Sequence, residues 1–320
     1  MVNITGKVLR ILPVRETKSV AGTKKVVDLI IADTYEYRKV SLWDEKAELV
    51  CRGDINVGDV LRLENASVPA ESKNGRDKRV NAGRYTQITK ISMSIAALSQ
   101  APALNLTVLA VARPEKGQVC IAGIDESGEW IRPQGIHEND IFGSREEYFR
   151  NLGITKVYVD EWRGRRPRRE DRFFVFGNGV ERILTADEQR EFLERNVDAA
   201  VDAVFKTGRS LGLIKPRILH VYEENTKKKD KSHEMYIRLN FRDASGRIYR
   251  RWSCRCDSFY KTWNDLKRRH RWTYGWRMLR YLRKNDTYLA IGLTYSDYGA
   301  ADRLEYGAYP LIVGVHVVRG

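Results

Sequence analysis

The sequence predicts a mainly β protein with some helix (α+β), built from multiple small five-stranded barrels. Short apolar runs, several of them alternating with polar residues, are separated by Gly, Asp and Asn turns along most of the chain. Helical periodicity occurs in only a few segments. Hydrophobic residues make up 42% of the 320 residues and charged residues 31%, a balance that excludes both a disordered chain and a membrane protein.

Residues 1–92 are expected to form the first domain. Strands are predicted at 26–33, 39–45, 59–68 and 84–92, with a short helix between Asp44 and Cys51. Five strands with a helix after the third suit a small closed barrel.

The rest of the chain divides into a linker and a larger domain. Residues 93–104 are short, small and weakly patterned, and they predict the linker. Residues 105–136 predict an antiparallel meander that begins the domain 105–320. The later elements expected are helices at 145–152, 186–206, 257–270 and 273–284, and strands at 217–223, 234–242, 247–253, 287–295 and 309–318.

Three motifs in the first domain occur in a characteristic order. An apolar strand ends in Ala32-Asp33, the next strand carries Leu42-Trp43-Asp44, and Gly58-Asp59-Val60 leads to Glu64-Asn65-Ala66. This order resembles the OB-fold of archaeal single-stranded DNA-binding proteins and replication protein A. The resemblance implies that Trp43 stacks on a base. Ser67, Val68 and Pro69 follow the last motif, where the family usually has further stacking aromatics.

The larger domain carries a second set of motifs. They are Leu109–Arg113, Gly123–Asp125 with Gly128–Pro133, Ser210–Pro216, and a C-terminal pair of apolar runs. This set resembles the dual OB-containing domain family of prokaryotes. The resemblance implies two further OB-like barrels, nucleic-acid binding and no catalytic residues.

Positive charge points to a polyanionic partner. Lys and Arg total 57 against 42 Asp and Glu, for a net charge of +15. Residues 247–284 alone hold 13 basic and two acidic side chains, with nine aromatics among them. Solvated helices usually mix both signs, so this imbalance favours nucleic acid, either single-stranded DNA or RNA.

We predict that arginines and lysines hold phosphates while aromatics stack on bases. The predicted nucleic-acid-binding residues are Trp43, Arg38, Lys39, Arg76, Lys78, Arg79, Tyr85, Arg165, Arg166, Arg168, Arg169, Lys227, Lys228, Lys229, Arg250, Arg251, Trp252, Lys267, Arg268, Arg269, Arg271, Tyr274, Trp276, Arg280 and Arg283.

Patterns typical of catalysis or of a resident cofactor are missing from the sequence. It contains no phosphate-binding loop, no dinucleotide fingerprint and no HExxH motif. Cys254 and Cys256 form a CxC pair with no second pair nearby, which favours a buried pair over a metal site. We therefore expect a non-enzymatic protein with no cofactor and no bound metal.

Three functions remain open at this point. The first is a cytoplasmic nucleic-acid-binding protein without a membrane partner, which acts on single strands or occludes RNA channels of the ribosome. It would then contact replication or ribosomal proteins. The second is a nuclease or nucleic-acid-modifying enzyme using carboxylates such as Asp125, Glu126 and Glu129. The third is an adaptor whose first barrel binds another protein.

Overall fold

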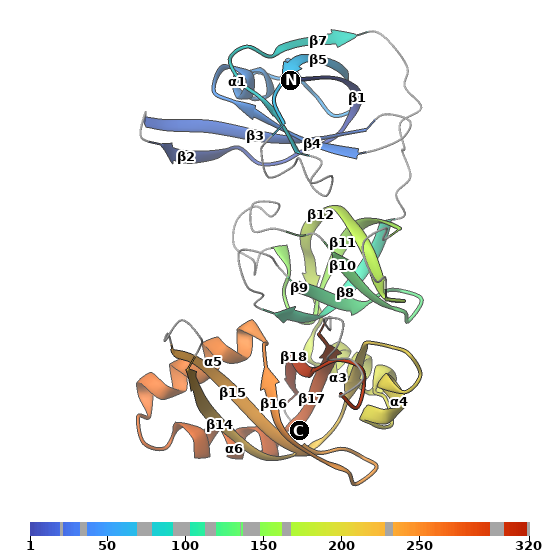
Figure 1. Cartoon of the computed structure of the whole chain (residues 1–320), viewed down its shortest axis with the longest axis vertical. Helices are drawn as coiled ribbons and strands as arrows, with labels where there is room; N and C mark the ends of the chain where they lie inside the picture. The colour runs from blue at the N-terminus through green and yellow to red at the C-terminus, as the bar shows by residue number, and fades with distance from the viewer. Residues whose placement is uncertain are drawn as a thin grey trace. The chain divides into compact units, whose positions relative to one another are not determined.

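The computed structural model describes residues 1–19, 22–32, 37–68, 79–91, 103–112, 120–134, 136, 148–161, 168–227, 233–294 and 304–318. The chain forms two compact units, Met1–Ala101 and Pro102–Gly320, which are shown in Figure 1 and described separately. Among the described residues no helix is both long and apolar enough to span a membrane. The predicted linker 93–104 falls almost entirely outside the described ranges.

In its described residues the first unit is a seven-stranded sheet with one helix. Its strands run in the order β6-β4-β3-β1-β5-β7, with β2 paired to β3. Ser67, just after β5, exchanges two backbone hydrogen bonds with Asn81 of β6, of 2.9 and 2.8 Å, and these link β5 to β6 so that the strands from β6 to β5 form a barrel. The elements are β1 (Val2–Ile11), β2 (Arg15–Ser19), β3 (Gly22–Ala32), β4 (Tyr37–Trp43), α1 (Glu45–Cys51), β5 (Val60–Ala66), β6 (Arg79–Ala82) and β7 (Gln87–Ile91).

Strand alternation decides which side chains fill this barrel. Val40 and Leu42 of β4 are fully buried in its core, together with Val27 and Leu29 of β3. Trp43 is on the opposite face of β4 and is half-buried. Helix α1 follows β4 directly, so the helix predicted between Asp44 and Cys51 is confirmed.

The second unit begins with a closed five-stranded barrel. Its strand order is β10-β12-β11-β8-β9, with β9 paired back to β10 and with β10 and β12 parallel. In order along the chain, this is the 1-2-3-5-4 arrangement of an OB-fold. The strands are β8 (Ala103–Ala112), β9 (Cys120–Ile124), β10 (Trp130–Gln134), β11 (Gly153–Glu161) and β12 (Asp171–Ile183).

A six-stranded sheet, here called the C-terminal sheet, completes the second unit. Its order is β13-β17-β18-β16-β15-β14, with β16 and β18 parallel. Strands β14 to β18 therefore repeat the OB order. The elements are α3 (Ala186–Asn196), α4 (Val201–Phe205), β13 (Leu211–Ile214), β14 (Arg217–Lys227), β15 (His233–Arg242), β16 (Ile248–Cys254), α5 (Asp257–Arg269), α6 (Tyr274–Lys284), β17 (Asp286–Leu293) and β18 (Pro310–Val318).

The C-terminal sheet differs from a closed barrel at one seam. In the described residues β14 does not pair with β17, and β13 takes the place next to β17. Helix α6 packs on both β14 and β17 instead. The Arg283 guanidinium of α6 donates hydrogen bonds to the carbonyls of Ile218 and Leu219, at 2.9 and 2.6 Å, and so satisfies part of the β14 edge. Of the two further barrels expected, one is closed and the other is open and covered by a helix.

Two predicted helices need correction. The single helix expected at 186–206 is two helices, because Asp198 leaves the helical path. Its backbone N–H bonds to the Leu213 carbonyl and its carboxylate accepts from the Leu213 N–H at 3.0 Å. In the helix expected at 145–152, residues 145–147 lie outside the described part, and 149–152 are not helical.

Two barrel strands were not predicted. Val157 and Val159 of β11 are buried and alternate as a strand requires, so the signal for β11 was present. In β12 the sequence around Gly177 is typical of a turn. The structure instead uses this glycine for close packing, since the Tyr148 hydroxyl lies 2.9 Å from its N–H and 2.7 Å from its carbonyl. Strand β2 and the four-residue strands β6 and β13 were also missed.

The closed barrel and the C-terminal sheet meet where β8 packs on β18. A Cβ atom on Gly314 would lie 2.0 Å from the Leu109 carbonyl, so only glycine fits there. His316 is fully buried beside it, and its Nε2 lies 2.9 Å from the same carbonyl. Because a carbonyl only accepts, Nε2 of His316 carries a proton. Burial lowers the pKa of His316 to about 4.

This pKa predicts an acid sensitivity of the second unit. An unfolded histidine titrates near its ordinary pKa of 6.5, so the unfolded state binds more protons below that pH. Stability is therefore complete above pH 6.5 and falls as the pH drops toward 4. We expect a loss of about 2 kcal/mol between pH 7 and pH 5 from this group.

Urea denaturation followed by tryptophan fluorescence measures this loss, since six of the seven tryptophans lie in the second unit. His316→Gln keeps an N–H donor and removes the titration. The pH dependence should be weaker in this variant than in the wild type. Equal slopes in the two proteins would contradict the assignment.

Candidate nucleic-acid interface

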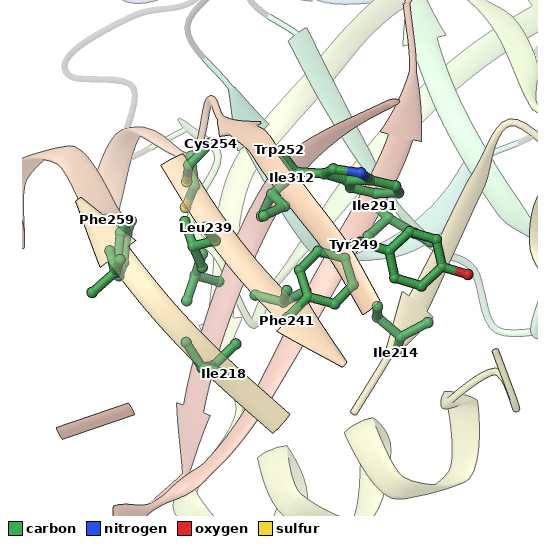
Figure 2. Close-up of a cluster of buried hydrophobic side chains, with 14 of the residues drawn as sticks. Ile214, Ile218, Leu239, Phe241, Tyr249, Trp252, Cys254, Phe259, Ile291 and Ile312 are labelled. Atoms are coloured by element: carbon green, nitrogen blue, oxygen red, sulfur yellow. The ribbon is translucent and has the colours of Figure 1, made fainter. Parts of the chain in front are cut away.

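A β-bulge determines which side chains of β16 face the core. Tyr249 and Trp252 are three residues apart and both are buried, because Arg251 adopts φ 60° between them and the register with β15 shifts there. The Trp252 ring packs edge-on against Phe241 and Tyr249, with centroid distances of 5.2 and 5.3 Å (Figure 2). The prediction that Trp252 stacks on a base is wrong, because its ring is part of the core.

The same bulge turns both Arg250 and Arg251 outward. They join a cationic surface formed by the strand faces opposite the core, here called the β14–β16 outer face. This face carries six arginines and, among its described residues, a single carboxylate. Its members are Arg217, His220, Tyr222, Glu224, Tyr236, Arg238, Asn240, Arg242, Arg250, Arg251, Ser253 and Arg255.

The charges on this face are only partly balanced. Glu224 accepts from Arg238 at 2.6 Å and also from Arg251. Arg217 lies directly opposite Arg242 in the β14–β15 register, and like charges in this position are destabilising. Among the described residues, Arg217, Arg242 and Arg250 form no ion pair.

Aromatic rings stand among these charges. The Arg238 and Arg255 guanidinium carbons lie 5.0 and 4.8 Å from the centre of the Tyr236 ring. Tyr222 is paired across the strands with Arg238. A guanidinium group held over a tyrosine ring offers hydrogen-bond donors to phosphate. The ring beside it offers a flat apolar surface.

Helices α5 and α6 form a second cationic region. On α6, Met278 and Leu282 are buried while Trp276, Arg277 and Arg280 face outward. The exposed positions, here called the α5–α6 outer surface, are Arg268, Arg269, Arg271, Trp272, Trp276, Arg277, Arg280 and Lys284. Arg268 pairs with Asp265, but that pair is exposed and weak.

Several residues predicted for binding here have structural partners instead. Glu223 accepts from the Lys267 ammonium at 2.7 Å and from the Trp263 indole at 2.6 Å. The hydrogen bond to Glu223 raises the pKa of Lys267. Burial and the charge of Glu223 raise the pKa of Tyr274, whose ring packs edge-on against Trp263 at 5.1 Å. Lys267, Tyr274 and Arg283 thus fasten the helices to the sheet.

The second predicted arginine cluster also has a structural member. Arg168 donates to the carbonyls of Leu293 and Thr294, at 2.6 Å to the former, which ties the barrel to the end of β17. Arg169 is exposed beside Glu129 at 3.4 Å. The predicted residues outside the described part are Arg76, Lys78, Arg165, Arg166, Lys228 and Lys229, and the side chain of Lys227 is not described.

The predicted residues of the first barrel have mixed surroundings. The Lys39 ammonium lies 3.4 Å from the buried Asp28 and is only 11% exposed. The Trp43 indole donates to Asn81 at 3.5 Å. Tyr85 is 78% exposed, in the turn before β7. Arg38 and Arg79 are half-buried. Only Tyr85 in this set presents a widely open ring.

Asp125, one of the carboxylates considered for a nuclease, serves the fold. Asp125 accepts hydrogen bonds from the N–H groups of Ser127 and Glu129, at 2.9 and 3.0 Å, and thereby closes the β9–β10 turn. Among the described residues no three His, Cys, Asp or Glu side chains are grouped as metal ligands. Cys254 and Cys256 are buried free thiols, and burial raises the pKa of Cys254.

Some exposed residues of these surfaces were not predicted from the sequence as binding residues. Trp272, whose ring at 89% exposed is the most open among the described residues, was not predicted, whereas the half-buried Tyr274 was. Helical spacing contains the signal, since Tyr274, Met278 and Leu282 fall on one face and Trp276 and Arg280 on another. Alternation in β15 likewise indicates that Tyr236, Arg238 and Arg242 share a face.

Comparison with known proteins gives matches of fold only. No protein-family model and no curated protein matches the sequence. Among solved structures, an OB domain from Thermoplasma acidophilum is 24% identical, with a TM-score of 0.23, and the match covers 29% of this chain and 76% of that one. The replication factor A related protein from Methanobacterium thermoautotrophicum is 22% identical over 28% and 79% of the two chains, with a TM-score of 0.25.

A replication protein A heterotrimer bound to single-stranded DNA covers 99% of this chain and 93% of its own, at 8% identity and a TM-score of 0.29. The proteins similar to this chain thus include an OB domain and two replication proteins. Because each TM-score is below 0.5, the OB assignment depends on the strand order described above.

The different surroundings of two tryptophans give a direct prediction. Trp252→Ala should lower the free energy of unfolding by about 3–5 kcal/mol, because it removes the centre of an aromatic core. Trp276→Ala should change it by less than about 0.5 kcal/mol, because the ring is exposed. Urea denaturation followed by circular dichroism measures both. Similar effects of the two substitutions would contradict the placement of these rings.

Proposed function

We propose that this chain is a non-enzymatic nucleic-acid-binding protein of the OB type and that the β14–β16 outer face is its principal binding surface. One observation carries the proposal: three arginines of this face have no ion-pair partner among the described residues, and two of them, Arg217 and Arg242, lie opposite each other. A row of phosphates relieves this repulsion and satisfies the guanidinium groups.

The location within the fold supports the same conclusion. Strands β14, β15 and β16 are the first three strands of the OB order, and the face of the second and third strands is where OB-folds bind oligonucleotides. Tyr222 and Tyr236 supply rings for stacking on this face.

The first barrel is the weaker candidate for the main surface. Lys39 lies against Asp28, and the Trp43 indole donates to Asn81. Its motif also lacks the further aromatics that follow in the family it resembles. Single-stranded DNA and RNA, including ribosomal RNA, are both compatible with an arginine-rich sheet, and tyrosine rings among the arginines favour single strands of either kind.

The test removes the three unpaired arginines together, as Arg217→Gln, Arg242→Gln and Arg250→Gln. The affinity for a 30-nucleotide single strand should fall at least about a hundredfold at low salt. The slope of log affinity against log salt should shrink by about 2, since each lost phosphate contact contributes about 0.7 for a single strand. Fluorescence anisotropy over a salt series measures both quantities.

A matched control removes the same charge from another part of the second unit. Arg182→Gln, Arg195→Gln and Lys206→Gln change cations that are all more than half exposed and lie beside carboxylates. This control should bind nearly as the wild type does. Equal losses in both triple variants would show that only net charge matters and would overturn the assigned surface. Absence of binding by the wild-type protein would overturn the function.

A further inference from the structure

Two tryptophans on the α5–α6 outer surface expose large apolar rings to solvent. Trp272, in the turn between α5 and α6, is 89% exposed, and Trp276, in the first turn of α6, is 59% exposed. Each has an arginine over its ring. The Arg271 guanidinium carbon lies 5.6 Å from the Trp272 centroid, and that of Arg280 lies 5.3 Å from the Trp276 centroid.

An arginine on one side of an indole orders the ring and leaves its other side open. Trp276 and Arg280 also line a shallow pocket with Leu279, Arg283 and Lys284, all of them from α6. The indole, the guanidinium and an open apolar pocket therefore occur together on one face of this helix.

The charge of this surface is not balanced by nearby acids. Helix α6 contains four arginines and lysines and no carboxylate. Cations in the last turn of a helix favour the helix dipole, which accounts for Arg283 and Lys284. The dipole does not account for Arg271, Arg277 or Arg280, which lie in the turn before α6 or in its earlier part. Among the described residues none of these three pairs with an acid.

We infer that the two tryptophan–arginine pairs form a second binding site, separate from the β14–β16 outer face, for unpaired nucleotides of a nucleic-acid strand. Each indole stacks on one base, and the neighbouring arginine binds the adjoining phosphate. This inference depends on the proposed function, because the same protein must bind a strand at all.

The chemistry of the surface selects an unpaired strand over a duplex or a protein. A duplex hides the faces of its bases within the stack, so two exposed indoles gain nothing from it. An acidic protein would pair with the arginines but would not require open indole faces. Bases provide both a flat ring and an adjacent negative charge.

The experiment compares two 20-nucleotide probes with the same phosphates, a thymidine strand and an abasic strand. The variant Trp272→Ala/Trp276→Ala should bind the thymidine strand at least about tenfold more weakly than the wild type does. Its affinity for the abasic strand should remain unchanged, because both arginines are retained. The control Tyr309→Ala removes another exposed ring of the second unit, at 59% exposed, and should bind both probes as the wild type does.

The outcomes separate the inference from the proposed function. Equal thymidine-strand affinity of the double variant and the wild type overturns the stacking site, and it assigns the two tryptophans to another partner such as a protein. An equal loss on both probes overturns it as well, because stacking on bases cannot act on an abasic strand. Absence of wild-type binding to either probe overturns the proposed function.

Discussion

The open seam between β14 and β17 is the constraint on which the C-terminal sheet depends. Without a strand pair at this position, the β14 edge needs other hydrogen-bond partners, and the core beside it needs a cover. Helix α6 provides both, through Arg283 at the Ile218 and Leu219 carbonyls and through its buried Met278 and Leu282. The opposite face of α6 is then left to solvent, and that face carries Trp276 and Arg280.

The same arrangement determines which face of the sheet is available to a ligand. The core, α5 and α6 occupy the inner side of β14, β15 and β16, so strand alternation sends Arg238 and Arg242 to the other side. The bulge at Arg251 adds two more arginines to that side while it keeps Trp252 inside. The concentration of positive charge on this sheet face therefore follows from which face the core and the two helices cover. It explains the excess charge of residues 247–284 only in part, because Lys267 and Arg283 serve the fold.

The sequence predicted most strands and the α5–α6 pair, since alternation and helical spacing are strong there. That Arg250 binds phosphate stays a prediction, and its side chain is exposed. Trp252 was misassigned because a bulge breaks the two-residue period of the strand. At this bulge the Asn240 side chain accepts a hydrogen bond from the Arg251 N–H at 2.7 Å. The partner of Lys267, Glu223, lies 44 residues earlier in the chain. Contacts of this range have no local pattern, so the sequence alone cannot separate a structural arginine or lysine from a binding one.

Ultraviolet cross-linking of the full chain to a uniformly labelled single strand, followed by mass spectrometry of the attached peptides, tests the central claim most directly. The account predicts attachment to the β14–β16 outer face, with Tyr222 and Tyr236 as the main sites. Attachment confined to the first barrel, at Trp43 or Tyr85, would contradict it.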